Sequence, residues 1–317
     1  MSVEEKIPVV AIVGPTASGK TDLAVSAAER FCGEVISADS MQIYSELEIG
    51  TAKPTEKEMR GVPHHMLGFL SVDKDYSVAN YVADAAQNIK DVSGRKKLPI
   101  ICGGTGLYVD SLLTNTEFSE IKSDPVLREK LIVFANEHGS MALYKMLEHD
   151  DPESAAAIHP NNVGRVVRAL EVLKVTGVPL CEHKRRSHPE PPPYRVCYIG
   201  TGFENRERLY CRIEQRIDKM LEEGVLNEAK LLFERGDAST AAQAIGYKEF
   251  FPYFRGEETL EEAVLKLKAD TRHYAKRQLT WFRRNENINW FYNDCFESKE
   301  VLYQAVFDKI SEFLEEQ

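Results

Sequence analysis

The feature that most constrains the fold of this chain is a glycine-rich segment that directly follows a short apolar run. Residues 7–13 read IPVVAIV, residues 14–21 read GPTASGKT, and residues 21–31 have helical spacing. The apolar run predicts a strand that is buried on both faces of a parallel sheet. The segment after it matches G-x-x-x-x-G-K-[ST], in which backbone amides and a helix N-terminus surround phosphate oxygens. We therefore expect a phosphate-binding loop between a strand and a helix.

This loop predicts a site for phosphate or diphosphate, but it does not identify a reaction. Lys20 would bring a positive charge to the phosphate groups, and the hydroxyl of Thr21 can hold Mg²⁺. A glycine-rich turn that binds no ligand is the alternative. The candidate phosphate-binding residues are Gly14, Pro15, Thr16, Ala17, Ser18, Gly19, Lys20 and Thr21.

The rest of the chain predicts an α/β fold with a helical insertion. Helical segments separate further strand-like runs, which favours a doubly wound parallel sheet flanked by helices. The runs lie at 34–37, 98–102, 195–201 and 288–292. Residues 120–180 carry helical patterns without a convincing strand, and a Pro-rich turn follows at 188–194. We expect a core formed by 1–118 and 192–317, with a mainly helical domain at 119–191.

Composition excludes several classes of protein. The net charge of −10 argues against a protein that merely coats nucleic acid. The six cysteines include no C-x-x-C pair, which indicates thiols in a reducing compartment. The first residues are acidic where a signal peptide is basic, and the apolar runs fall short of the ~18 residues of a membrane helix. We expect a cytoplasmic protein without membrane contact.

Two polar residues are expected where neighbouring strands end. Asp39 follows the second strand-like run, 19 residues after Lys20, and Thr105 lies in GGTGLY after the third. Ligands bind at the carboxyl ends of the strands in open α/β sheets. Asp39 could be a metal ligand, a general base or the cap of a following helix. The glycines around Thr105 could allow close approach of a ligand or could simply form a turn.

Basic residues are concentrated within two of the later helical segments. Arg208, Arg212 and Arg216 share one helix face, where they could clamp an anion or form a solvated face beside glutamates. Residues 263–284 contain seven basic residues and one acid, with interleaved aromatic residues. That pattern is typical of a groove for a polyanion, and a solvated face is the alternative. His64 and His65 are adjacent, which favours a loop or phosphate contact over a metal site.

The ordered motifs resemble those of the tRNA dimethylallyltransferases, also called tRNA isopentenyltransferases, of the compact bacterial type. They are GPTASGKT, DSMQIY at 39–44, GTAKP at 50–54, PHHML at 63–67, GGTGLY at 103–108, AIGYKE at 244–249 and AKRQLTWFRR at 275–284. The resemblance implies a P-loop NTPase-like core and an insertion that grips the anticodon stem-loop. It implies transfer of dimethylallyl from dimethylallyl diphosphate to N6 of adenosine 37 in tRNA, with Mg²⁺, by a monomer.

The resemblance also implies roles for individual residues. Asp39 matches the general base, and Thr105 matches a contact to the diphosphate near the bond that breaks. Lys20, Thr21 and either Arg212 or Arg216 match contacts to diphosphate and metal. Other stretches of the chain match segments that contact tRNA in this family, and the basic helical segment at 263–284 adds further candidates. The expected tRNA-binding residues are Asp39, Ser40, Met41, Gln42, Thr105, Gly164, Arg165, Arg168, Gly246, Tyr247, Lys248, Lys268, Arg272, Lys276, Arg277 and Arg283.

Two other functions share parts of this pattern. A small-molecule or nucleoside kinase would also use the phosphate loop and Asp39, with Arg165 and Arg168 in a lid. A non-catalytic, nucleotide-gated RNA-binding protein would not depend on Asp39 for its effect. The basic helix discriminates against the kinase, because a kinase should tolerate neutralisation of that helix whereas a tRNA enzyme should lose affinity.

Overall fold

The computed structural model describes residues 6–118, 124–187, 191–236 and 241–316. The chain divides into two compact units, one formed by Met1–Leu113 with Pro192–Gln317 and the other by Thr114–Pro191. The predicted domain boundary at residue 119 and much of the Pro-rich turn lie outside the described residues.

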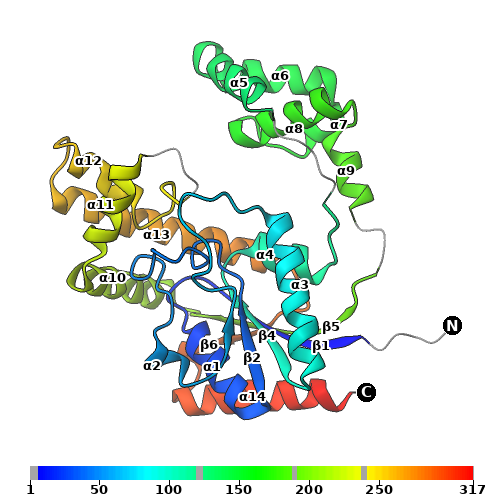
Figure 1. The fold of residues 1–317 in the computed structure, drawn as a ribbon, viewed down its shortest axis with the longest axis vertical. Helices are drawn as coiled ribbons and strands as arrows, with labels where there is room; N and C mark the ends of the chain where they lie inside the picture. Colours follow the sequence, from blue (N-terminus) through cyan, green and yellow to red (C-terminus); the bar gives the residue numbers. More distant parts are fainter. Residues whose placement is uncertain (1–5, 119–123, 188–190, 237–240, 317) are drawn as a thin grey trace. The chain divides into compact units, whose positions relative to one another are not determined.

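The first unit contains a six-stranded parallel sheet, which confirms the predicted α/β fold (Figure 1). β1 lies in its interior, where Val10 pairs with Ile100 of β4 on one side and with Cys197 of β5 on the other. The strand order is β3-β2-β4-β1-β5-β6. The strands are β1 (Ile7–Val13), β2 (Gly33–Ser37), β3 (His64–His65), β4 (Leu98–Gly103), β5 (Tyr194–Gly202) and β6 (Asn289–Tyr292).

Helices cover both faces of the sheet, as the continuous apolar strands require. Val10 and Ile12 face α1 (Lys20–Phe31) and α14 (Lys299–Glu315). Val9 and Ala11 face α3 (Val78–Gly94) and α4 (Gly106–Leu113). All four side chains are fully buried. Each of the three larger side chains contributes roughly 1.5–3 kcal/mol of hydrophobic free energy relative to exposure, so β1 is anchored on both sides beneath the phosphate loop.

A layer of helices packs beyond the carboxyl ends of the strands and forms a separate core with residues 41–47. Gly224, with a φ of 99°, ends one helix and starts the next. These elements are α10 (Arg206–Glu223), α11 (Val225–Arg235), η1 (Lys248–Phe250), α12 (Phe251–Phe254) and α13 (Leu260–Phe282). The short elements α2 (Glu56–Met59) and η2 (Asn293–Cys295) complete this unit.

The second unit consists of helices with their own apolar core around Leu143, Leu147 and Val166. Gly139 adopts a φ of 85° and divides what the sequence pattern presents as one helical stretch at 125–148. The helices are α5 (Pro125–His138), α6 (Ser140–Asp150), α7 (Pro152–Ala156), α8 (Val163–Thr176) and α9 (Leu180–Arg186).

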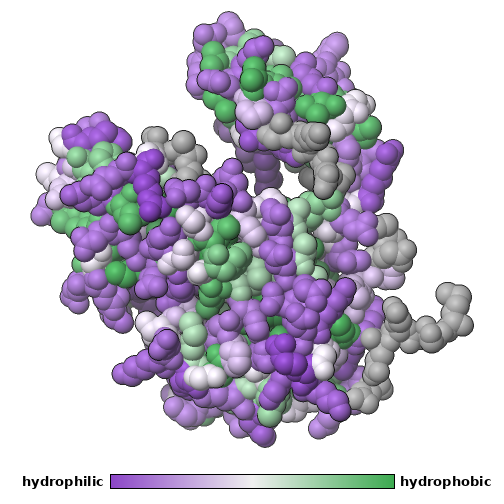
Figure 2. All heavy atoms as spheres, viewed as in Figure 1, coloured by the Kyte–Doolittle hydropathy of each residue, from purple (hydrophilic) through white to green (hydrophobic). Residues whose placement is uncertain are grey.

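The surface of the molecule is mainly hydrophilic on the face shown in Figure 2. Within the part of the chain that the structure describes, no helix is both long and apolar enough to span a bilayer.

Candidate active site

The phosphate loop connects β1 to α1, and two distant helices fix its shape. From α10, Arg212 Nε donates to the carbonyl of Ala17 at 3.0 Å, and Arg216 donates to Thr16 Oγ1 at 3.1 Å. The amide of Thr16 donates to Gln278 Oε1 of α13 at 2.8 Å. The structure places Arg212 and Arg216 in contact with the loop, as the interpretation as an anion clamp requires. Arg208 and Arg212 are exposed, and Arg216 is partly buried.

Lys20 begins α1 and lies inside the loop. Its Nζ donates to the carbonyl of Pro15 at 3.0 Å. Burial lowers the pKa of Lys20, and Arg216 lowers it further, whereas the carboxylate of Asp39 opposes these effects. Two cations that share this buried space without a full anionic partner repel one another. A bound diphosphate would relieve that repulsion, which is the electrostatic signature of an anion site.

Asp39 follows β2 and lies on the wall of the same cavity as Lys20. Its Oδ1 accepts hydrogen bonds from the amides of Met41 at 2.9 Å and Gln42 at 3.4 Å. The alternative that Asp39 caps a following helix is wrong, because the chain turns here and α2 begins only at Glu56. No described residue donates to Oδ2, so this oxygen keeps its lone pairs for a substrate.

The loop after β4 brings Thr105 against the segment that contains Asp39. Thr105 Oγ1 accepts a hydrogen bond from the amide of Ser40 at 3.1 Å. The glycines before it meet protein rather than open space: a Cβ on Gly104 would lie 2.2 Å from Gln278 Nε2, and one on Gly103 would lie 2.1 Å from the carbonyl oxygen of Ala38. Close packing against β2 and α13 therefore explains why a side chain is excluded at Gly103 and Gly104, and Gly103 also lines the cavity, where a ligand could approach its backbone.

Gln278 is a site residue that sequence reasoning missed. Its side chain is buried and bridges two loops, accepting from the amide of Thr16 and donating to the carbonyl of Gly104 at 2.9 Å. It lies on the face of α13 that also carries Leu267 and Tyr274. A polar residue that continues an otherwise apolar helix face was the signal that could have found it.

The phosphate loop, Asp39 and α10 enclose one cavity of about 390 Å³. Its polar side is formed by Lys20, Thr21, Asp39 and Arg216, and Asp39 is the single carboxylate among the described residues that line it. Its other walls are largely apolar. They include Ile213, Ile217, Met220, Ala244, Ile245 and Leu267.

A loop of residues 48–52 forms another wall of the cavity and positions Gln42. The side-chain amide of Gln42 donates to the carbonyls of Thr51 at 3.2 Å and Ala52 at 3.1 Å. Its oxygen accepts from Ser37 Oγ at 3.1 Å. Both polar atoms of the Gln42 side chain thus form hydrogen bonds with protein groups. The orientation of Gln42 therefore depends on the position of the loop.

The carboxylate of Glu228 on α11 holds this loop in place. It accepts hydrogen bonds from the amides of Glu48 and Ile49 at 2.9 Å and of Gly50 at 3.1 Å. The hydroxyl of Tyr247 donates to the same carboxylate at 2.9 Å. Tyr247 is fully buried, so the prediction that it contacts tRNA conflicts with the structure: its side chain supports the loop instead.

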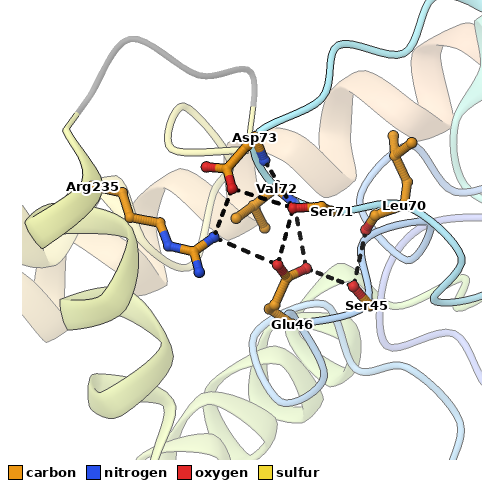
Figure 3. A network of polar contacts seen from close by, with 7 residues as sticks. All are labelled: Ser45, Glu46, Leu70, Ser71, Val72, Asp73 and Arg235. Carbon is orange, nitrogen blue, oxygen red and sulfur yellow. Dashed lines mark hydrogen bonds and ion pairs between the residues drawn. The ribbon is translucent and has the colours of Figure 1, made fainter.

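A second polar network ties the far end of α11 to the same region (Figure 3). Arg235 lies 3.3 Å from Asp73 Oδ2 and 3.5 Å from Glu46 Oε1. Glu46 in turn accepts from Ser71 Oγ at 3.2 Å and from the amide of Val72 at 3.3 Å. These contacts are partly exposed, so we expect them to contribute less than the contacts of Glu228.

The two adjacent histidines form edge strand β3, so the predicted loop is wrong at this point. His65 Nε2 lies 2.7 Å from the buried carboxylate of Glu34. His64 Nδ1 contacts the carbonyl oxygen of Val62 at 2.8 Å, and its Nε2 lacks a hydrogen-bond partner among the described residues. His64 lines the cavity. The described residues contain no group of three His, Cys, Asp or Glu side chains that could hold a metal.

The basic residues of α13 have different surroundings. Lys268 pairs with Asp218 and Arg272 pairs with Glu214, each at 2.5 Å, and both acids belong to α10. Arg277 lies over the ring of Tyr274, 5.6 Å from its centroid. Lys276 and Arg283 are exposed.

The expected tRNA-binding residues of the second unit lie in the first two turns of α8. Gly164 and Arg165 are exposed, and Arg168 pairs with the fully buried Glu171 at 2.8 Å. Arg128 of α5 contacts the same carboxylate at 2.9 Å. Burial alone raises the pKa of Glu171, but hydrogen bonds from Arg168, Arg128 and the amide of Asp124 outweigh it and lower the pKa to about 2.

A parallel sheet with a phosphate loop after β1, a carboxylate at the end of the neighbouring strand and an enclosed cavity define a P-loop NTPase-like transferase core. Residues 42–285 match the model of the IPP transferase family. The chain belongs to this family of tRNA prenyltransferases.

Similar proteins cover nearly the whole chain. A tRNA dimethylallyltransferase of Thermoanaerobacter sp. (strain X514) is 46% identical over 95% of this chain and 96% of its own length. The crystal structure of a full-length tRNA isopentenylpyrophosphate transferase from Bacillus halodurans is 44% identical, covers 98% of both chains and has a TM-score of 0.74. A eukaryotic dimethylallyltransferase, described as acting on tRNA, is 30% identical, with a TM-score of 0.75 over 90% of this chain and 74% of that one.

Proposed function

We propose that the chain transfers a dimethylallyl group from dimethylallyl diphosphate to N6 of adenosine 37 in tRNA and releases diphosphate. The observation that carries this proposal is the cavity beside the phosphate loop, in which two cations and one carboxylate face a largely apolar wall. The cations suit a diphosphate, the apolar wall suits an allylic group, and the carboxylate suits an amine that must lose a proton.

The donor would bind with its diphosphate in the loop. Lys20 and Arg216 line the cavity beside the loop and would stabilise the negative charge that grows as the allylic C–O bond breaks. The apolar side chains of Ile213, Ile217 and Leu267 would exclude water from the electron-poor allylic carbon. The bond electrons leave with the diphosphate.

Mg²⁺ fits the residues that are present. Thr21 offers a hydroxyl on the cavity wall, at the position where phosphate loops hold this ion. Mg²⁺ usually keeps several waters and takes its other ligands from substrate phosphates, so the lack of a carboxylate cluster in the described part of the chain is compatible with it. When bound, Mg²⁺ would neutralise charge on the leaving diphosphate.

Asp39 would act on the acceptor. The lone pair of an exocyclic adenine amine is delocalised, so the amine becomes a useful nucleophile only as its proton is removed. We assign that proton to Oδ2 of Asp39, because the amides of Met41 and Gln42 already occupy Oδ1. The N6–carbon bond forms while the C–O bond breaks. Adenosine 37 must leave its stack to reach the cavity, at a cost of a few kcal/mol.

The tRNA would use both units of the chain. We assign the helical unit at 114–191 to the anticodon stem-loop, with the exposed Gly164 and Arg165 among its contacts. Ser40, Met41, Gln42 and Gly246 line the cavity and are suited to contacts with the loop bases. We further propose that the protein acts as a monomer in the cytoplasm.

The test is diphosphate release from dimethylallyl diphosphate, measured with and without an unmodified anticodon stem-loop and in the absence of ATP. We expect release that requires both the RNA and Mg²⁺. ATP consumption with a phosphorylated product, and no RNA-dependent release of diphosphate, would contradict the proposal and favour the kinase.

A further inference from the structure

The second half of the phosphate loop is held by a segment that follows β6. The contacts from α10 and α13 hold Thr16 and Ala17, which belong to the first half of the loop. Asn293, the first residue of η2, instead reaches Ser18. Its Nδ2 donates to the carbonyl of Ser18 at 3.0 Å and to the carbonyl of Gly202, the last residue of β5, at 2.8 Å. One side chain therefore ties the loop to the sheet.

Two neighbouring contacts fix this side chain and the residue that it holds. The carboxylate of Asp294 accepts from the amides of the two residues that precede α10, at 2.8 and 2.9 Å, which anchors η2. Ser18 Oγ and Thr201 Oγ1 share a buried hydrogen bond of 2.7 Å. Both partners of Asn293 Nδ2 are carbonyl oxygens, so the side-chain amide must present its nitrogen here rather than its oxygen.

This arrangement directs the backbone amide of Gly19. The carbonyl of Ser18 and the amide of Gly19 belong to one trans peptide unit, so they point in opposite directions. Because Asn293 holds the carbonyl, the amide points away from η2, and among the described residues it has no hydrogen-bond acceptor. Gly19 adopts a φ of 86° and caps α1, at a helix end whose first amides lack partners and attract anions.

We propose that Asn293 is a positioning residue for the donor, an inference that rests on the proposed function. By holding the Ser18 carbonyl outward, Asn293 keeps the Gly19 amide directed at a diphosphate oxygen. If this peptide turned over, it would present a carbonyl oxygen to the diphosphate, and the negative charges of the two groups would repel one another. Asn293 thus acts on the diphosphate through the loop, and not on the five-carbon group or on the RNA.

The test compares Asn293→Leu with the matched control Asn289→Leu in the full chain. Asn289 lies at the start of β6 and makes the equivalent contact to β5, from its Nδ2 to the carbonyl of Tyr198 at 3.1 Å. Among the described residues, it forms no hydrogen bond with the phosphate loop. Asn293→Ala is a second variant, which places no bulk against the two carbonyls.

Calorimetry in the presence of Mg²⁺ measures the affinity of each protein for dimethylallyl diphosphate and for inorganic diphosphate, and thermal unfolding measures its stability. We expect both substitutions of Asn293 to weaken binding of dimethylallyl diphosphate about threefold to tenfold, the size of one typical hydrogen bond. Inorganic diphosphate should lose affinity by the same factor. Asn289→Leu should lower the melting temperature by an amount similar to Asn293→Leu but bind both ligands as wild type does.

Three results would overturn the proposal. The first is equal donor affinity in wild type and both variants of Asn293. The second is an equal loss of donor affinity in Asn289→Leu, which would reveal a general effect of lowered stability. The third is a loss confined to dimethylallyl diphosphate, which would place the effect at the five-carbon group.

Binding of an anticodon stem-loop separates this role from a general disturbance of the site. Wild type and Asn293→Leu should bind the stem-loop equally, and a loss of RNA affinity in the variant would contradict an action on the diphosphate alone. If wild type binds neither dimethylallyl diphosphate nor inorganic diphosphate, the proposed function fails and this inference fails with it. If wild type binds both and modifies the stem-loop while the variants of Asn293 are its equal, only the role of Asn293 fails.

Discussion

Asp39 shows how a single residue combines a local structural role with chemistry. Its Oδ1 orders the turn after β2 by accepting from the amide of Met41 at 2.9 Å, and we propose that its Oδ2 takes the proton of the acceptor. An asparagine would preserve the first role, because its carbonyl oxygen accepts the same hydrogen bond. It would lose the second, because an amide cannot take a proton at neutral pH.

We predict that Asp39→Asn lowers the rate of group transfer by about 10²–10⁴-fold, the usual contribution of a positioned base. The affinity for dimethylallyl diphosphate and the melting temperature should change little. Single-turnover transfer and calorimetric titration of the donor measure the two effects separately. A variant that transfers normally once the donor is bound would rule out the role of Asp39 as the base.

Gln278 is a second single residue on which the site depends, and it acts by holding the phosphate loop and the loop after β4 in place. Replacing it with leucine removes the partner of the Thr16 amide, which is partly buried, and that of the Gly104 carbonyl, which is buried. Each unsatisfied group costs about 1–3 kcal/mol. We therefore predict that Gln278→Leu lowers the melting temperature and weakens donor binding, because the phosphate loop loses its support from α13. Gln278→Glu should restore only the hydrogen bond from the Thr16 amide. If Gln278→Leu bound the donor as tightly as wild type does, this role for Gln278 would be contradicted.

At the scale of elements, α11 supports a wall of the cavity, although Val225 is its one residue that lines the cavity. Glu228 holds the amides of residues 48–50, and the loop they belong to fixes Gln42 through the carbonyls of Thr51 and Ala52. A displacement of α11 would therefore reach Gln42, which lines the cavity.

We predict that Glu228→Ala destabilises the protein by roughly 1–3 kcal/mol and raises KM for tRNA more than it lowers kcat, because the loop amides lose a charged acceptor. Arg235→Gln is the control: it changes the partly exposed network at the other end of α11 and should cost less than about 1 kcal/mol. Equal effects of the two changes on KM would contradict a specific role for Glu228.

The elements that the sequence predicted correctly are those whose signals are local. The apolar runs of β1, β2, β4 and β5 specify a buried parallel sheet, and the phosphate loop specifies the turn into α1. β3 was missed because two histidines on a sheet edge have no apolar pattern. The partners of Gly104, Gln278 and Tyr247 could not be predicted, because each lies far away in sequence; for Gln278 the sequence offers only the signal of a polar residue on an apolar helix face.

At the scale of the whole molecule, the two units have separate cores and separate determinants of stability. In the helical unit, the fully buried Glu171 joins α5 to α8 through Arg128 and Arg168. Hydrogen bonds lower its pKa to about 2, below the ordinary value of 4.5. A lowered pKa in the folded state stabilises the fold above pH 4.5, and this stability is lost as the pH falls from 4.5 towards 2.

We predict that acidification over this range opens the helical unit and that Glu171→Gln removes much of this pH dependence, at a cost on the order of 2 kcal/mol at neutral pH. Hydrogen exchange of the α5 and α8 amides in the full chain measures the effect in this unit alone. Glu182→Gln is the control, since Glu182 makes exposed ion pairs in the same unit. Identical exchange in wild type and Glu171→Gln at neutral pH would refute the prediction.

The most direct measurement for the whole account is nucleoside-resolved mass spectrometry of an anticodon stem-loop with adenosines at 36, 37 and 38, after incubation with the protein, Mg²⁺ and dimethylallyl diphosphate. The account predicts a five-carbon addition on adenosine 37 that is lost in Asp39→Asn and in an RNA with guanosine at that position. An unmodified RNA, or an addition at another nucleoside that persists in Asp39→Asn, would contradict it.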